Sequence, residues 1–219
     1  MMKLCGASVS PFFERIVIML DMKGALGQIE LAPVPGGFKS DEHFAYHPMG
    51  KIPFLIKEDG TSLTESQVIA EYLDRTLAGP SMVPSDSEEA AQAQAIARVM
   101  DLYYFAAIHP IGGAAFGGEI SDEALDKARD QDIPAAFNYL EKYLGTDGFA
   151  VGSHWTIADA ALISQLYWYE TLTTRFGLKD FSAHPKLKAY WDGIKNTELV
   201  LRSFDRVKKS YDEVTAGND

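Results

Sequence analysis

The chain has 219 residues, of which 47% are hydrophobic and 23% charged, and its formal net charge is −11. This balance is typical of a globular protein with one large or two small domains, and the negative charge argues against nucleic acid as a partner, because lysines and arginines drive that binding. No stretch approaches the roughly 20 apolar residues of a membrane span, and a single cysteine, Cys5, allows no intramolecular disulfide. We therefore expect a cytoplasmic protein without membrane contact.

The first third of the chain alternates short apolar strands with amphipathic helices. Glycine, proline and helix-capping residues mark the boundaries of these elements and predict the order β-α-β-α-β-β-α, with the first two strands parallel. The predicted elements are a strand at 2–5, a helix at 11–23, a strand at 28–32, a short helix starting at 40–42, a strand at 52–56, a hairpin strand at 61–63 and a helix capped by Thr64, with Val68, Ile69, Tyr72 and Leu73 on its buried face.

Everything after about residue 87 has helical periodicity. Residues 78–87 are rich in proline, glycine and serine and predict a linker. Further on, Thr156 is expected to cap a helix in a capping box with Asp159. The expected organisation is an α/β domain at 1–77 and an all-helical bundle at 88–219, frayed at 216–219. The expected helices are 88–108, 121–144, 156–176, 184–196 and 198 to about 211.

Ser10 and Pro11 mark the start of the first helix. Serine is a good N-cap, proline suits the first helical position, and Ile16, Val17 and Leu20 recur at helical spacing. The N–H groups and the positive dipole end of such a helix favour an anion beside Ser10. The same pattern also fits a serine that only caps a helix.

Three separated stretches together resemble one known family. They are Ser10-Pro-Phe-Phe-Glu-Arg, His47-Pro-Met-Gly-Lys-Ile-Pro-Phe-Leu and Leu63-Thr-Glu-Ser-Gln-Val-Ile-Ala-Glu-Tyr-Leu. Their order, followed by an all-helical remainder, resembles the cytosolic glutathione S-transferases over essentially the whole chain. The resemblance implies a thioredoxin-like first domain, a helical second domain and glutathione as co-substrate.

The resemblance also implies a set of glutathione contacts. Pro53 would follow a cis peptide bond that leaves the Ile52 backbone free to pair with the cysteinyl unit. Glu65 would take the γ-glutamyl ammonium and Ser66 the γ-glutamyl carboxylate, while Lys39 would reach the glycyl carboxylate. The alternatives are first-turn helix residues, a strand-edge proline and a solvated loop lysine.

The thiol-activating position is implied by the same comparison. Ser10 stands where the similar omega-class stretch Cys-Pro-Phe-Ala-Glu-Arg has cysteine, so Ser10 is the candidate to hydrogen-bond the glutathione sulfur, with Ser8 as runner-up. Cys5 falls in the predicted first strand, where a buried apolar role is expected. Disulfide exchange is therefore disfavoured, because it needs a protein thiol at the site.

The predicted electrophile pocket involves Phe12, Tyr103, Tyr104 and His109. Each could instead belong to the core, and His109, before Pro110, could simply end a helix. The remaining histidines lack metal-ligand spacing, so no metal is expected.

The expected function is a glutathione transferase that adds the thiolate to a small hydrophobic electrophile by conjugation, dehalogenation or ether cleavage. A homodimer is implied by the resemblance. The alternatives are a non-catalytic ligand-binding or interaction protein of the same fold and a glutathione-dependent isomerase. The run Ala7-Ser8-Val9-Ser10 lacks the Ser-Ser-Cys-like sequence expected of a zeta-type isomerase.

Overall fold

A computed structural model describes residues 1–216 and divides the chain into two compact units. Unit 1 comprises 1–83 together with the C-terminal segment from 197, and unit 2 comprises 84–196. This division differs from the predicted domains, because the last helix, α10 (Glu198–Ala216), packs within unit 1. Of the predicted frayed tail, Ala216 still belongs to α10, and 217–219 lie outside the described residues.

Unit 1 contains a four-stranded sheet in the order β2-β1-β3-β4. β1 and β2 are parallel, as predicted, whereas β3 pairs antiparallel with β1 and with β4. β3 begins two residues later than predicted, after the cis Ile52–Pro53 bond. The bounds are β1 (Lys3–Cys5), α1 (Pro11–Met22), a 3₁₀ turn (Leu26–Gln28), β2 (Glu30–Ala32), α2 (Asp41–Tyr46), β3 (Phe54–Ile56), β4 (Ser62–Thr64) and α3 (Ser66–Thr76).

Helix α3 differs from the prediction in its cap and its buried face. Its N-cap is Glu65, one residue later than the predicted Thr64, because the chain turns sharply between β4 and the helix. Ile69 and Leu73 are buried, but Val68 is half exposed and Tyr72 is only partly buried. The buried face therefore includes smaller and polar residues that an apolar count does not find.

A buried ion pair joins α1 to α3. The Nζ atom of Lys23, directly after α1, lies 3.0 Å from Oδ1 of Asp74, and both side chains are almost fully buried. Asp74 also accepts the backbone N–H groups of Met82 and Val83 at 2.8 and 3.2 Å. The Asp74 carboxylate thus holds the segment at residues 82–83 against the ends of α1 and α3.

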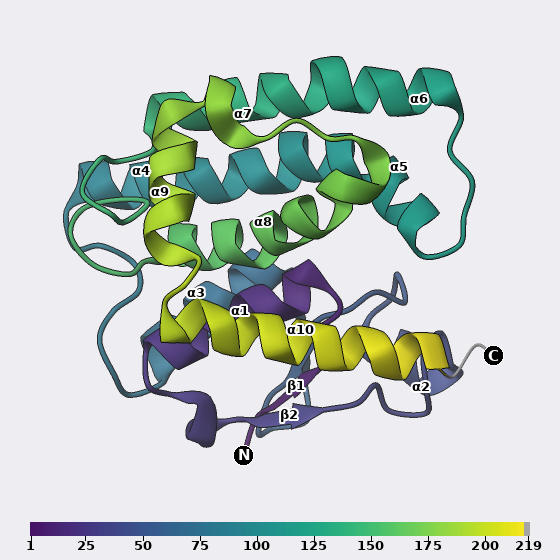
Figure 1. Cartoon of the computed structure of the whole chain (residues 1–219). Coiled ribbons are helices and arrows are strands. Elements are labelled where there is room, and N and C mark those ends of the chain that lie inside the picture. Colours follow the sequence, from purple (N-terminus) through teal and green to yellow (C-terminus); the bar gives the residue numbers. More distant parts are fainter. Residues whose placement is uncertain (217–219) are drawn as a thin grey trace. The chain divides into compact units, whose positions relative to one another are not determined.

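Helix α10 runs beside α1 (Figure 1). Ser203 Oγ donates to Glu14 Oε1 at 2.8 Å, and Arg206 Nε donates to the same oxygen at 2.9 Å. Arg206 and Arg202 also pair with Asp21, at 3.3 and 3.0 Å. The contact is polar and charged along most of its length, with Val200 and Val207 buried beside it.

Unit 2 is helical throughout its regular structure in the described part of the chain. α4 and α5 form one long segment through a π-helical turn at Met100–Tyr104, and α6 and α7 are joined likewise at Ala128–Asp132. Pro110 lies inside α5, so His109 does not end a helix. The helices are α4 (Ser87–Val99), α5 (Phe105–Ala115), α6 (Asp122–Lys127), α7 (Ile133–Tyr143), α8 (Ile157–Phe176) and α9 (Pro185–Ile194), with a 3₁₀ turn at Phe181–Ala183.

The predicted capping box at the start of α8 is present. Thr156 Oγ1 accepts the N–H of Ala158, and Asp159 Oδ2 accepts the backbone N–H of Thr156 at 2.8 Å. The other oxygen of Asp159 accepts the N–H of Ala150 and the hydroxyl of Tyr190, at 2.9 and 3.0 Å. Burial raises the pKa of Asp159 although these donors oppose the shift. This carboxylate therefore organises the loop before α8 as well as the helix start.

Candidate functional site

The sheet register brings four loops to one end of unit 1. Cys5 pairs with Ala32 and with Phe54, and Phe54 pairs with Thr64. These four residues therefore lie at the same end of the sheet. The loops that follow β1, β2 and β4, and the one that precedes β3, begin or end there and carry the predicted site residues. These loops hold Ser8 and Ser10, Lys39, Ile52–Pro53, and Glu65–Ser66.

Backbone strain is concentrated at two of the predicted residues. Within residues 1–216, the non-glycine residues with positive φ are Lys39, at 62°, and Glu65, at 71°. Such conformations cost about 1–3 kcal/mol each and persist where the surrounding structure holds them, often at binding sites. Both side chains are exposed at the sheet end, where they can meet a ligand.

Ser66, the first residue of α3, lies over a buried cation. The Nη1 atom of Arg15 donates to Ser66 Oγ at 3.4 Å, and the Arg15 side chain is 1% exposed. Because Ser66 Oγ accepts from Arg15, its own proton remains available for an acceptor outside. The helix N-terminus, the serine hydroxyl and the guanidinium charge together favour a bound carboxylate.

Ser10 and Ser8 differ in what their hydroxyl groups do. The Ser10 carbonyl accepts the N–H groups of Phe13 and Glu14, but its side chain makes no capping hydrogen bond. Ser8 instead lies close enough to the Glu14 carboxyl group to lower its pKa. Burial raises the pKa of Glu14, while Arg206, Ser8 and Ser203 oppose that shift. Ser10 therefore caps α1 through its backbone, and its hydroxyl is not used for capping within the described residues 1–216.

The loop between these serines is held by α10. The N–H of Val9 donates to Ser210 Oγ at 3.1 Å, and Glu14, one turn into α1, is held by Ser203 and Arg206. The last helix thus fixes both sides of the serine loop.

The four residues predicted for the electrophile pocket lie in different environments. Phe12 belongs to unit 1, where the Arg15 guanidinium lies 5.5 Å from its ring centre. Tyr104 is completely buried, and burial raises its pKa well above the usual value, so it cannot line a pocket in this conformation. Tyr103 is half exposed, and its ring packs against Tyr139. His109 is exposed beside the ring of Phe105.

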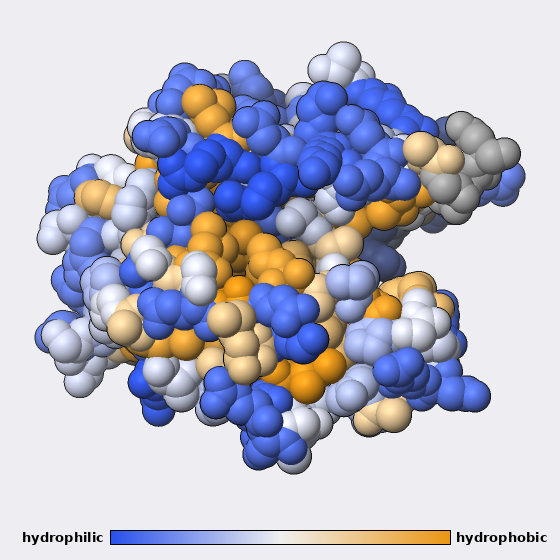
Figure 2. Space-filling view, turned by 90° about the horizontal axis from the view of Figure 1, so that it is seen from below, coloured by the Kyte–Doolittle hydropathy of each residue, from blue (hydrophilic) through white to orange (hydrophobic). Residues whose placement is uncertain are grey.

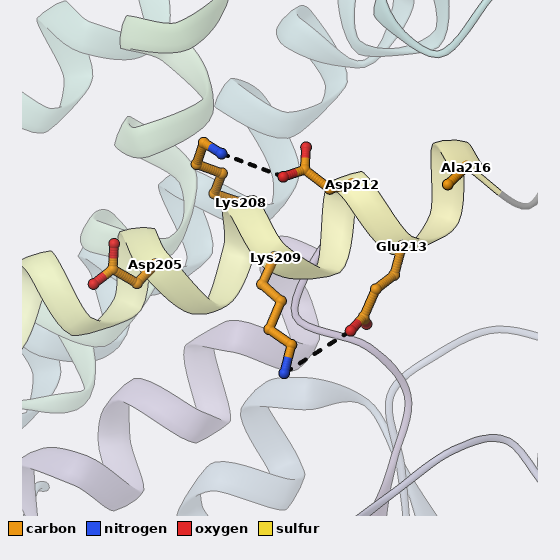
Figure 3. A pocket seen from close by; sticks show the side chains of 6 residues that line it. All are labelled: Asp205, Lys208, Lys209, Asp212, Glu213 and Ala216. Atoms are coloured by element: carbon orange, nitrogen blue, oxygen red, sulfur yellow. Dashed lines mark hydrogen bonds and ion pairs between the residues drawn. The ribbon is translucent and has the colours of Figure 1, made fainter.

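Seen from below, the surface carries a hydrophobic area flanked by hydrophilic residues (Figure 2). Within unit 2, Tyr103 and Tyr139 line a groove of about 310 Å³ together with Leu102. A larger depression of about 540 Å³ runs along α10, where Lys208 pairs with Asp212 and Lys209 with Glu213 (Figure 3). These two ion pairs place charged groups along the depression, and Asp205 adds a further carboxylate to its lining.

Residues 1–216 contain no group of three or more His, Cys, Asp or Glu side chains placed to hold a metal ion. Over the same range, no helix has the length and apolar character that crossing a bilayer requires.

Sequence reasoning did not assign roles to Arg15, His43 or Ser210. Arg15 stands in the Ser10–Arg15 motif, and a charged pair, Glu14 and Arg15, between apolar residues was the available signal. Ser210 bonds the backbone of Val9, which is 201 positions away in the sequence. The His43 ring bonds backbone groups of Lys39 and Lys51, which residue type does not mark.

Comparison with known families gives a direct result. The glutathione S-transferase N-terminal domain matches residues 4–81, and the glutathione S-transferase C-terminal domain matches residues 96–198. These matches cover most of the chain, so the chain belongs to the glutathione S-transferase family. The predicted fold class, a thioredoxin-like domain followed by a helical domain, is confirmed.

Individual relatives are more distant. A maleylacetoacetate isomerase of Rattus norvegicus is 31% identical over 197 residues, which is 87% of this chain and 84% of the relative. The structure of a Tau class glutathione S-transferase from mango, Mangifera indica, is 25% identical, with a TM-score of 0.77 and coverage of 98% and 97%. A maleylacetoacetate isomerase from Methylobacterium extorquens AM1, with bound malonate and GSH, is 26% identical, with a TM-score of 0.71 and coverage of 92% and 95%.

Proposed function

We propose that the chain binds glutathione at the sheet end of unit 1 and activates its thiol for attack on a small hydrophobic electrophile. The reaction would be conjugation, dehalogenation or ether cleavage. The observation that carries this proposal is the register that brings the Ser8–Ser10, Ile52–Pro53 and Glu65–Ser66 loops to one sheet end. Membership of the glutathione S-transferase family supports it.

Each part of glutathione has a chemically suitable partner. The Glu65 carboxylate would pair with the γ-glutamyl ammonium, and Ser66, above Arg15, would donate to the γ-glutamyl carboxylate. The Ile52 backbone would pair with the cysteinyl unit like an added strand. Lys39 would reach the glycyl carboxylate.

Ser10 would donate its hydroxyl proton to the glutathione sulfur at the N-terminus of α1. A free thiol with a pKa of about 8.5 is roughly 3% ionised at pH 7, and a decrease of about 2 units raises that to roughly three quarters. Ionisation alone therefore gives at most about a thirtyfold acceleration. The rest would come from holding the thiolate against the electrophile.

Disulfide exchange through a protein thiol has little support. Position 10 is serine, and Cys5 is buried in β1, where burial raises the pKa of its thiol to about 11. Such a thiol carries almost no thiolate at neutral pH.

Isomerisation through glutathione is a second candidate, because the maleylacetoacetate isomerases are among the similar proteins. The same thiolate would add to a double bond and leave again after rotation, so the glutathione contacts above would serve both reactions. Incubation with maleylacetoacetate, followed for the loss of the cis isomer, separates isomerisation from conjugation.

We also propose a cytoplasmic homodimer. Exposed apolar side chains in unit 1 (Phe38, Phe44 and Met49) and the Leu102–Tyr103–Tyr139 groove in unit 2 offer surfaces that a second copy could cover. Light scattering after size exclusion should give twice the mass of the 24.1 kDa chain.

Calorimetric titration with glutathione tests the binding proposal. The wild type should bind, and Glu65→Gln and Ser66→Ala should each weaken binding about tenfold, the size of one charge-assisted hydrogen bond. Glu58→Gln, at an exposed glutamate in the turn between β3 and β4, is the matched control and should bind like the wild type. Absence of glutathione binding in the wild type would contradict the proposal.

A further inference from the structure

His43 is a buried histidine of α2 whose two ring nitrogens contact different segments. Nδ1 accepts the backbone N–H of Lys39 at 3.0 Å, and Nε2 lies 2.9 Å from the carbonyl oxygen of Lys51. A backbone N–H can only donate and a carbonyl can only accept, so the ring is neutral and carries its proton on Nε2. The ring is fully buried and stacked on Phe54, with ring centres 5.4 Å apart.

Both partners of His43 lie next to proposed glutathione contacts. The Lys39 N–H belongs to a residue held at a φ of 62°, which a lysine rarely adopts without support. The Lys51 carbonyl directly precedes Ile52 and the cis Pro53. The N–H of His43 itself donates to Ser40 Oγ at 3.1 Å, which fixes α2 against the Lys39 loop.

We propose that His43 is a positioning residue that sets two parts of the glutathione site independently, one through each ring nitrogen. Nδ1 holds the Lys39 backbone so that the lysine reaches the glycyl carboxylate. Nε2–H holds Lys51 so that the Ile52 backbone faces the cysteinyl unit. This inference rests on the proposed glutathione binding.

Two ligands separate the two effects. Glutathione and γ-glutamylcysteine differ only in the glycyl unit, so their affinity ratio reports the Lys39 contact. The affinity for γ-glutamylcysteine alone reports the Ile52 segment. Both affinities are measured by calorimetric titration.

Two variants separate the two nitrogens. In His43→Asn, the side-chain oxygen is as many bonds from Cβ as Nδ1 and can accept the Lys39 N–H. In His43→Gln, the side-chain nitrogen is as many bonds from Cβ as Nε2 and can donate to Lys51. Both variants lose the ring stacked on Phe54, so each controls for the other.

The expected result is a crossed pattern. His43→Gln should keep the affinity for γ-glutamylcysteine and reduce the glycine preference by roughly two- to tenfold, the range for one hydrogen bond. His43→Asn should keep the glycine preference and weaken binding of both ligands by a similar factor. In a Lys39→Ala background, His43→Gln should cause no further loss of preference.

Other outcomes overturn the inference. Equal losses in both variants would show that the ring only fills space, and unchanged binding in both would show that His43 is not needed. Should the variants not fold, nitrogen NMR of the wild-type imidazole decides: a proton on Nδ1 overturns the inference, and a proton on Nε2 with a protected Lys39 amide supports it. If the wild type binds neither ligand, the proposed function fails as well, which distinguishes that failure from a loss of the crossed pattern alone.

Discussion

Replacing Arg206 by methionine would remove the cation that faces Glu14 where α10 meets α1. The Glu14 carboxylate has no exposed surface, and the Arg206 side chain is 24% exposed. Breaking a buried ion pair by removing one partner costs about 3–5 kcal/mol. Because Arg206 is partly solvated and the Ser203 hydroxyl still donates to Glu14, we expect a loss of about 2–3 kcal/mol in unfolding free energy near pH 8.

The loss should depend on pH. Burial already raises the pKa of Glu14 above its ordinary value, and loss of the Arg206 charge should raise it further. A carboxyl group whose pKa is higher in the folded state contributes stability below its unfolded pKa and loses it as pH rises through the folded pKa. The deficit of Arg206→Met relative to the wild type should therefore shrink as the pH is lowered from about 8 to about 5.

Urea unfolding at about pH 8 and at about pH 5, followed by circular dichroism, measures the loss in unfolding free energy. A loss of about 2–3 kcal/mol lowers the midpoint by roughly 1 M urea. Arg202→Met is the matched control, because Arg202 is 44% exposed while it pairs with Asp21 and Glu198, and it should cost under about 1 kcal/mol. Equal losses for the two arginines, or a deficit that does not change with pH, would refute the reasoning.

Three further changes follow from buried groups. Lys23→Met should lower the unfolding free energy by about 3–5 kcal/mol in urea melts, and adding Asp74→Leu should not recover that loss, because the backbone N–H groups of Met82 and Val83 would lose their acceptor. Asp159→Ala leaves several buried donors without an acceptor and should cost more than about 3 kcal/mol, whereas a loss below 1 kcal/mol in the same melts would contradict this. Cys5 should resist iodoacetamide in the native protein and react after denaturation, as mass spectrometry can follow, and alkylation of the native thiol would contradict its raised pKa.

The order of elements could be predicted because each has a strong local signal. Ser10 with Pro11 predicted the start of α1, and Thr156 with Asp159 predicted the start of α8. Proline was a less reliable signal for a helix end, since Pro110 lies inside α5. A helix can contain an internal proline, although the proline cannot donate a backbone hydrogen bond.

The organisation of α10 could not be predicted. Its periodicity shows a buried face, but periodicity does not say which surface that face covers, and the helix directly follows α4 to α9, which belong to unit 2. The contacts of Ser203 and Ser210 with the α1 region span about 190 to 200 residues of sequence. The division between residues 83 and 84 falls inside the predicted linker, and only the placement of α10 in unit 1 depends on contacts between residues far apart in the sequence.

The candidate glutathione residues came from family resemblance, and the structure adds local conditions that sequence does not encode. The positive φ of Lys39 and Glu65 has no signal in residue type, because glycine or asparagine would be expected there. Tyr104 shows the reverse case: an aromatic residue at helical spacing is equally suited to a pocket and to a core, and here it lies in the core.

The ultraviolet absorbance of the bound glutathione thiolate tests the central claim most directly. In the wild type, the bound thiol should titrate about 2 units below its free pKa of about 8.5. In Ser10→Ala, it should return at least about 1 unit toward the free value while glutathione still binds, and Ser8→Ala, as control, should shift it less. Identical titration curves for the wild type and Ser10→Ala would contradict thiol activation by Ser10.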